Sequence, residues 1–225
     1  MVNLYKMPLP TSSFFLYNSF MKKFPEVIPV FPLSGVIYFP KTNLPLNVFE
    51  KRYLDLVNDA YKKDKLMGMV QSRKEDDGVY NIGCLGKISD YQKSEDGRIL
   101  INLTGVSRFK ILKEVSSNKL YREFKVDYKN FASDIENKLN EVDSDKLMDK
   151  AKTFFNKNGL LLNWKEFEKL DHLQKINTLA MISPITNEEK QKLLESISLE
   201  NKVKTLESII SFYLYETGTN NQTIQ

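Results

Sequence analysis

The dominant period of the hydrophobic pattern in this chain changes near residue 131. Before that point, the stretch from Leu120 to Tyr128 alternates between a mostly apolar and a mostly charged set of side chains. Alternation with a period of two is typical of a half-buried strand. After that point, apolar residues recur every three or four positions, most clearly from Leu199 to Tyr213, as in an amphipathic helix. The change of period predicts a sheet region followed by a helical region.

The sheet region contains further strand and turn signals. Apolar residues alternate over 99–103 and again over 109–115, and we expect a strand at each place. The tripeptides at 76–78 and 95–97 both end in glycine after an acidic residue, a composition that favours the tight turns of hairpins. These signals together predict several short antiparallel strands joined by hairpins.

One helix is expected inside the sheet region. Asn47 is a candidate N-cap, and Glu50 stands three residues later, where it would complete a capping box. Apolar residues then follow at helical spacing as far as Tyr61. Many strands with a single inserted helix predict a small mixed β-barrel.

The helical region carries its own boundary signals. Gly159 stands where one helix should end, because glycine readily takes the positive φ of a helix C-terminus. Capping boxes are predicted at 163–166 and at 186–189, where an asparagine or threonine precedes a glutamate by three residues. The expected structure is a small helical bundle.

The predicted fold class is therefore α+β, with a mixed β-barrel followed by an α-helical bundle. We expect a flexible extension at 1–25, a barrel subdomain at 26–131, a helical subdomain at 132–216 and a tail at 217–225. The chain of 225 residues is long enough to bury a core without disulfides or metals. Because the border is a change of period rather than a Gly/Ser linker, we expect the two halves to pack together.

Charge is distributed unevenly between the two halves. Residues 1–131 contain 21 basic and 14 acidic side chains, and residues 132–225 contain 12 and 15. A basic first half could attract nucleic acid, but dispersed lysines are more often a solvated surface.

The single cysteine favours a reducing cytoplasm, and the apolar runs are too short for a membrane-spanning helix. The apolar stretch near Phe15 lacks a following cleavage site, so a signal peptide is not expected.

Signals for catalysis and for metal binding are missing. The segment 83–89 (GCLGKIS) has too short a gap between its glycines for a phosphate-binding loop, and an isoleucine stands where Ser or Thr should hold magnesium. Cys84 and His172, the only residues of their types, lie in different halves without a local nucleophile signature. One cysteine and one histidine cannot supply the usual zinc ligands. We expect no enzyme activity, no metal and no cofactor.

A proline-punctuated string in the first half carries a resemblance to a known family. The string contains PVFPL at 29–33, FP at 39–40, LPL at 44–46 and FEKRY at 49–53. In this order and spacing it resembles the opening of the amino-terminal substrate-binding domain of Lon proteases. The prolines alone would also suit the rim of a barrel, since proline is confined to strand edges and turns.

The resemblance continues along most of the chain. Matching segments are IGCLGKI at 82–88, DGR at 96–98, GVSRF at 105–109 and EEKQKLLE at 188–195. The family resemblance implies a PUA-like barrel followed by a helical bundle, in agreement with the change of period. A complete Lon continues into an ATPase and a Ser–Lys peptidase, whereas this chain ends before either, so we expect neither activity here.

Two functions follow as hypotheses. The resemblance implies a module that binds unfolded or exposed hydrophobic polypeptides, as an adaptor or chaperone-like factor in quality control, with a protease in trans as a further partner. The alternative is RNA binding, motivated by the basic first half and by other PUA-like barrels, although fold analogy is a poor guide to function.

The sequence suggests candidate residues for binding and for bracing. Phe39, Phe49 and Tyr53 are candidates for a polypeptide-binding groove, and their alternative interpretation is a place in the core. Glu50, Arg52 and Arg108 are candidates for an ion-pair network that braces the barrel. The sequence alone does not choose between these interpretations.

Overall fold

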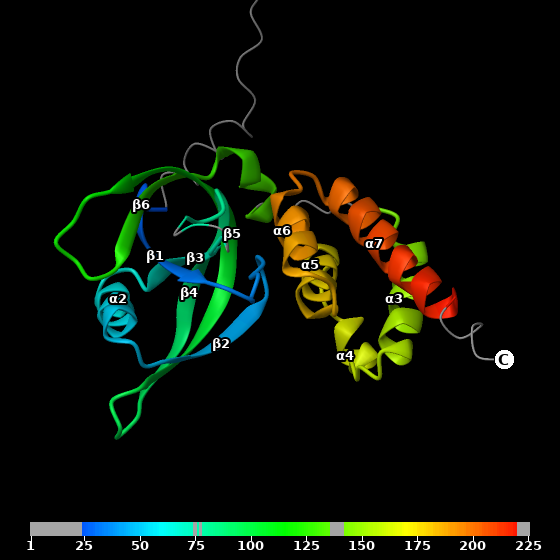
Figure 1. The fold of residues 1–225 in the computed structure, drawn as a ribbon, viewed down its shortest axis with the longest axis horizontal. Helices are drawn as coiled ribbons and strands as arrows, with labels where there is room; N and C mark the ends of the chain where they lie inside the picture. The colour runs from blue at the N-terminus through cyan, green and yellow to red at the C-terminus, as the bar shows by residue number, and fades with distance from the viewer. Residues whose placement is uncertain (1–23, 74–75, 77, 136–141, 220–225) are drawn as a thin grey trace, which may run out of the picture.

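The computed structural model describes residues 24–73, 76, 78–135 and 142–219, so most of the expected extension and tail lie outside it. Figure 1 shows a sheet-rich half beside a bundle of helices. The α+β class expected from the sequence is confirmed. No helix within the described residues is long and apolar enough to cross a membrane.

Six strands form one sheet in the first half. Their order across the sheet is β2-β5-β4-β3-β1-β6, with a further pairing between β5 and β6. The strands are β1 (Val27–Leu33), β2 (Asn43–Val48), β3 (Leu66–Gln71), β4 (Ile82–Lys93), β5 (Ile99–Val115) and β6 (Arg122–Asp127).

The sheet curls back on itself, as expected for the predicted mixed β-barrel, but it is not a closed barrel. The two strands expected at 99–103 and 109–115 are one long strand, β5, whose first part pairs with β2 and β4 and whose last part pairs with β6. Lys110 is the corner, because it lies opposite both Ile82 of β4 and Asp127 of β6. The curl is therefore completed along only part of β5.

One strand pair departs from the expected antiparallel arrangement. β1 and β3 are parallel, with Val30 opposite Gly68 and Leu33 opposite Gln71. A parallel pair requires a long crossover, and β2 and the helix α2 (Lys51–Lys62) supply it. The inserted helix predicted from the sequence is thus the reason for the parallel pair.

The helix α2 begins later than predicted. Asn47 is not its cap, because it lies within β2 opposite Leu100 of β5. Glu50 is the N-cap residue and makes no side-chain capping bond, while its carbonyl oxygen accepts the backbone N–H groups of Tyr53 and Leu54. Strand pairing with β5 therefore overrides the local capping signal.

Gly105 lets the middle of β5 pass close to another part of the backbone. A Cβ at this position would lie 2.2 Å from the carbonyl oxygen of Phe39. The contact is held by two backbone hydrogen bonds, from the N–H of Lys41 to Gly105 and from the N–H of Gly105 to Thr42, each 2.9 Å. The connection between β1 and β2 is thereby fixed against β5.

The second half is helical, as expected. It consists of α3 (Asp145–Lys157), α4 (Trp164–Phe167), α5 (His172–Ile182), α6 (Asn187–Glu195) and α7 (Leu199–Thr219), preceded by the 3₁₀ helix η1 (Lys129–Asp134). Gly159 has a φ of 65° just after α3, as predicted for a helix end. The capping box of Thr186 and Glu189 is confirmed, and Asn163 accepts the N–H of Glu166 at the start of α4.

The core of the helical half includes residues from the sheet half. Ile37 and Phe39, in the connection between β1 and β2, are buried in one cluster with Leu179 of α5 and with Val203 and Leu206 of α7. The apolar connection therefore inserts between the helices. It joins the two halves through a shared hydrophobic core.

A buried polar junction reinforces this contact. Arg108 of β5 is 2% exposed and forms a bidentate ion pair with Asp134 of η1, at 2.9 Å from Nε and 2.8 Å from Nη2. Its Nη1 also donates to the carbonyl oxygens of Leu194, at 3.1 Å, and of Ser196, which end α6. One arginine thus links the sheet, the 3₁₀ helix and the bundle.

A buried lysine completes the junction. The ammonium of Lys202 in α7 donates to Oδ1 of Asn177 in α5 at 2.7 Å, and Nδ2 of Asn177 donates to the carbonyl oxygen of Pro40 at 3.0 Å. Burial is the main reason that the pKa of Lys202 falls to about 7, with Arg108 lowering it further. We refer below to Arg108, Asp134, Asn177 and Lys202 as the buried junction.

Candidate functional site

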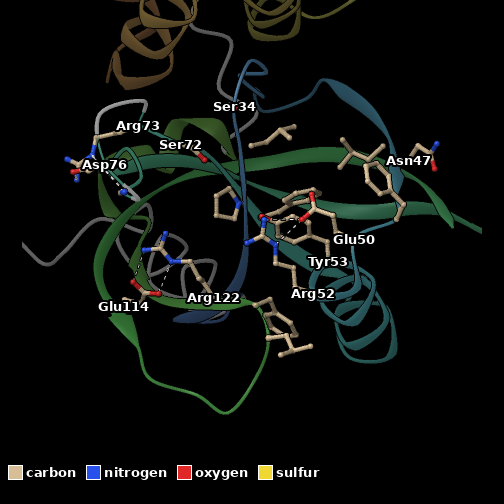
Figure 2. A pocket seen from close by; sticks show the side chains of 18 residues that line it. Ser34, Asn47, Glu50, Arg52, Tyr53, Ser72, Arg73, Asp76, Glu114 and Arg122 are labelled. Carbon is tan, nitrogen blue, oxygen red and sulfur yellow. Dashed lines mark hydrogen bonds and ion pairs between the residues drawn. The ribbon is translucent and has the colours of Figure 1, made fainter. Parts of the chain in front are cut away.

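A groove opens in the sheet half, away from the buried junction. Its volume is about 860 Å³, and every residue that lines it lies between Phe31 and Arg122. The end of β1, the turn between β2 and α2, and the strands β5 and β6 contribute to its walls (Figure 2). No residue of the helical bundle lines it, so the groove belongs to the curled sheet.

The floor of the groove is aromatic. The rings of Phe31 and Tyr53 lie against each other with centroids 3.9 Å apart, and both side chains are almost fully buried. Tyr121, just before β6, is also buried and donates its hydroxyl to Asp59 of α2 at 2.8 Å. Because these rings are held by core packing, the floor is preorganised.

Two large apolar side chains stand exposed beside this floor. Phe49 is 66% exposed and Leu120 is 59% exposed, and both line the groove. Exposed apolar patches on a folded protein commonly mark interaction sites. The groove therefore offers apolar surface to a partner.

Three arginine–carboxylate pairs surround the apolar surface. Their shortest N–O distances are 3.0 Å, 2.9 Å and 2.7 Å. Figure 2 shows Glu50 and Arg52 beside Tyr53 on one side, with the other two pairs on the opposite side. The pairs are Arg52–Glu50, Arg73–Asp76 and Arg122–Glu114. Because each arginine has a carboxylate beside it, the charges of the rim largely cancel.

The pairs and the burial are reflected in the acid–base properties of the groove. The hydrogen bond from Arg122 holds the pKa of Glu114 below its usual value. Burial raises the pKa of Tyr53 and of Tyr121 above that of a free tyrosine. Near neutral pH Glu114 is therefore charged and both phenols are neutral.

The structure brings four of the six candidate residues together. Phe49, Glu50, Arg52 and Tyr53 all line the groove, with Phe49 exposed and Tyr53 forming part of the floor. Arg52 pairs with Glu50 and lies over the ring of Tyr53, its Cζ 4.5 Å from the centroid. The string FEKRY thus contributes one continuous wall.

The other two candidates lie elsewhere. Phe39 is fully buried in the core shared with the helices and does not line the groove. Arg108 pairs with Asp134 in the buried junction, not with Glu50, and does not line the groove. The structure therefore divides the expected network into an exposed pair and a buried pair.

Sequence reasoning missed the opposite wall. Leu120, Tyr121 and Arg122 were assigned to a strand, yet they line the groove where β6 begins. A signal was present in the sequence, because the apolar alternation already begins at Leu120, before β6 starts at Arg122. Leu120 lies just outside the strand and is 59% exposed.

Neither Cys84 nor His172 lies in the groove. Cys84 is fully buried in β4, and burial raises the pKa of its thiol well above the usual value. His172 lies at the start of α5 in the helical half. Among the residues that the structure describes, no cluster of histidine, cysteine and carboxylate side chains is suited to hold a metal ion.

These features define a class: a curled sheet joined to a helical bundle, with an open amphipathic groove in the sheet. The profile of the ATP-dependent protease La (LON) substrate-binding domain matches residues 27–211. The chain therefore belongs to the Lon substrate-binding domain family. No ATPase or protease domain is detected beside it.

Two relatives show how much of a longer protein this chain represents. The Lon protease of Syntrophus aciditrophicus is 25% identical over 93% of this chain, which spans 28% of that protein. The Lon protease of Dictyoglomus thermophilum is 26% identical over 84% of this chain, which spans 24% of that protein. The chain thus spans about a quarter of the length of these relatives.

Solved structures show the same fold. A Lon N-terminal domain protein from Xanthomonas campestris superposes with a TM-score of 0.61 at 20% identity, covering 81% of this chain and 97% of that one. The N-terminal domain of the Mycobacterium avium complex Lon protease superposes with a TM-score of 0.58 at 15% identity, covering 82% and 98%. At these identities the likeness concerns the fold alone.

Proposed function

We propose that this chain binds unfolded or exposed hydrophobic polypeptide segments in the groove of its curled sheet. The observation that carries the proposal is the pair of exposed apolar side chains, Phe49 and Leu120, beside a rigid aromatic floor. Membership of a substrate-binding domain family supports polypeptide as the ligand class. Burial of apolar area would then supply most of the affinity.

The charges at the rim favour polypeptide over nucleic acid. Binding to phosphates depends on arginines and lysines that are available to replace counterions. The three arginines of the groove are each paired with a carboxylate, and a phosphate would have to displace it. A neutral polar rim around apolar surface suits a segment with mixed side chains.

The cellular role that we propose is that of an adaptor or chaperone-like factor in protein quality control, in the cytoplasm. The chain would hold a client without cleaving it, and a protease acting in trans would be one recipient. The buried, protonated thiol of Cys84 supports a role without nucleophilic catalysis. Purified chain should neither hydrolyse ATP nor cleave an unfolded protein, as measured by phosphate release and by gel electrophoresis.

The binding test compares one groove variant with one matched control. Phe49→Ser should weaken the binding of a fluorescent, permanently unfolded polypeptide roughly tenfold to a hundredfold, because burying a phenylalanine contributes about 1.5–3 kcal/mol. Leu161→Ser removes a fully exposed apolar residue of the helical half and should leave binding unchanged. Fluorescence anisotropy would measure both, with circular dichroism to check the fold.

A salt titration separates the two kinds of ligand. Polypeptide binding driven by apolar burial should persist from low to moderate salt, whereas phosphate-dominated RNA binding falls steeply. Tight, salt-sensitive binding of single-stranded RNA without detectable polypeptide binding would overturn the proposal. Equal losses of polypeptide affinity in Phe49→Ser and Leu161→Ser would show that the groove is not the binding site.

A further inference from the structure

The groove is the end of a longer path along the surface. A second hollow, of about 480 Å³, shares Leu120 and Tyr121 with the groove. A third and smaller hollow shares Asp59, Lys119 and Tyr121 with the second. The three hollows therefore lie side by side.

The path leads from the start of the described chain to the groove. The third hollow is lined by Pro25 and Val27, just after the first described residue, Phe24, whereas Phe31 lines the groove. The helix α2 follows the same course: Asp64, just beyond its last turn, lines the third hollow and Tyr53 lines the groove. β1 and α2 thus flank a surface path that begins where residues 1–23 join the fold.

The sequence of residues 1–23 resembles the exposed hydrophobic polypeptides proposed as ligands of the groove. It contains four consecutive large apolar residues, Phe14, Phe15, Leu16 and Tyr17, together with three lysines and no acidic residue. The path carries the carboxylates of Asp55, Asp59, Asp64 and Glu123 together with Lys62, Lys63 and Lys119, and Lys119 pairs with Glu123 at 2.7 Å. The charges of the path nearly cancel, so the match lies between the apolar cluster and the exposed apolar side chains of the groove, Phe49 and Leu120.

The length of the segment matches the length of the path. The helix α2 has 12 residues, which corresponds to about 18 Å at 1.5 Å per residue. The seven peptide steps from Tyr17 to Phe24 span up to about 23 Å when extended. The apolar cluster can therefore reach the groove.

We infer that residues 14–17 occupy the groove of their own chain and compete with external polypeptide. The inference rests on the proposed function of the groove and adds a regulatory element to it. A tethered segment has an effective concentration on the order of millimolar. Weak binding of the segment is then enough to reduce the affinity for a client several-fold.

A photo-crosslink tests the occupancy independently of any client. p-Benzoylphenylalanine placed at Phe15 of the full chain should, on irradiation, attach within the chain to residues 31–34, 46–53 or 120–122, as mapped by mass spectrometry. An equal mixture of ¹⁴N- and ¹⁵N-labelled chains distinguishes attachment within a chain from attachment between two copies. Attachment to the helical half, attachment only between copies, or none would each overturn the inference.

Client binding tests the competition. Substituting Phe14→Ser, Phe15→Ser, Leu16→Ser and Tyr17→Ser together should tighten the binding of an unfolded polypeptide roughly threefold to tenfold. The control variant Thr11→Ala, Ser12→Ala and Ser13→Ala should bind as the unaltered chain does. Unchanged affinity in the serine variant would overturn the competition, even with the crosslink in place.

The two measurements keep this inference separate from the proposed function. If the serine variant binds no polypeptide at all, the proposed function fails, while the crosslink still reports on occupancy. If the serine variant binds polypeptide and loses binding on Phe49→Ser, but no crosslink into the groove forms, the proposed function stands and the inference fails.

Discussion

The groove and the buried junction both contain arginine–carboxylate pairs, but they place them in opposite surroundings. In the junction, the side chains of Arg108 and Asp134 are 2% and 1% exposed. In the groove, those of Arg122 and Glu114 are 34% and 47% exposed. The same chemistry therefore fixes the two halves together at one place and leaves a solvated, adaptable rim at the other.

The surroundings determine what each pair contributes. A buried pair has lost its water, so removing one partner leaves an uncompensated charge and costs several kcal/mol. An exposed pair is screened, and its loss costs little. The junction should therefore determine stability and the groove should determine binding. Variants in the junction should lower the free energy of unfolding much more than variants in the groove.

The largest effect is expected at Asp134. Asp134→Ala should lower the free energy of unfolding by about 3–5 kcal/mol, because Arg108 would remain buried without its carboxylate. Urea unfolding followed by circular dichroism would measure the loss. A loss below about 1 kcal/mol would show that the pair does not hold the halves together.

An intermediate effect is expected from Lys202. Its pKa is about 7 in the folded protein and about 10.4 in an unfolded chain. Between these values the unfolded chain binds more protons, so the free energy of unfolding should rise with pH. From pH 7 to about 8.5 the gain from this group alone is roughly 1–2 kcal/mol.

The variant Lys202→Met removes the titrating group from the junction. Its free energy of unfolding should therefore rise less than that of the unaltered chain over the same pH range. Urea unfolding at several pH values would measure both slopes. Equal slopes in the two proteins would contradict the prediction.

The smallest effect is expected at Glu114. Glu114→Ala removes a carboxylate from an exposed pair and should change the free energy of unfolding by less than about 1 kcal/mol. It is the matched control for Asp134→Ala, since each removes the carboxylate partner of an arginine. Comparable losses in the two variants, measured by the same urea titration, would abolish the contrast between groove and junction.

Elements set by local pattern were predictable from the sequence. The strand over 122–127, the capping box of Thr186 and the helix end at Gly159 depend on neighbours within a few positions. The N-cap expected at Asn47 was wrong because pairing with β5, more than fifty residues away, takes that residue into a strand. Local signals failed where distant segments compete for the same backbone.

The candidate site was predictable on one wall only. The string at 49–53 marked the side formed by β2 and α2, because its residues are consecutive. Arg108 was noticed, but its partner Asp134 is 26 positions away and gave no pattern with it. Lys202 resembles any surface lysine in sequence, and only the packing of α5 and α7 buries it.

The insertion of Ile37 and Phe39 into the helical core means that the halves should unfold as one cooperative unit. These residues belong to the sheet half by position in the chain and to the helical half by packing. Cutting the chain near residue 131 would leave them exposed on one fragment and would open a gap in the core of the other. The two fragments should regain a native fold only when mixed, by complementation, rather than each folding alone.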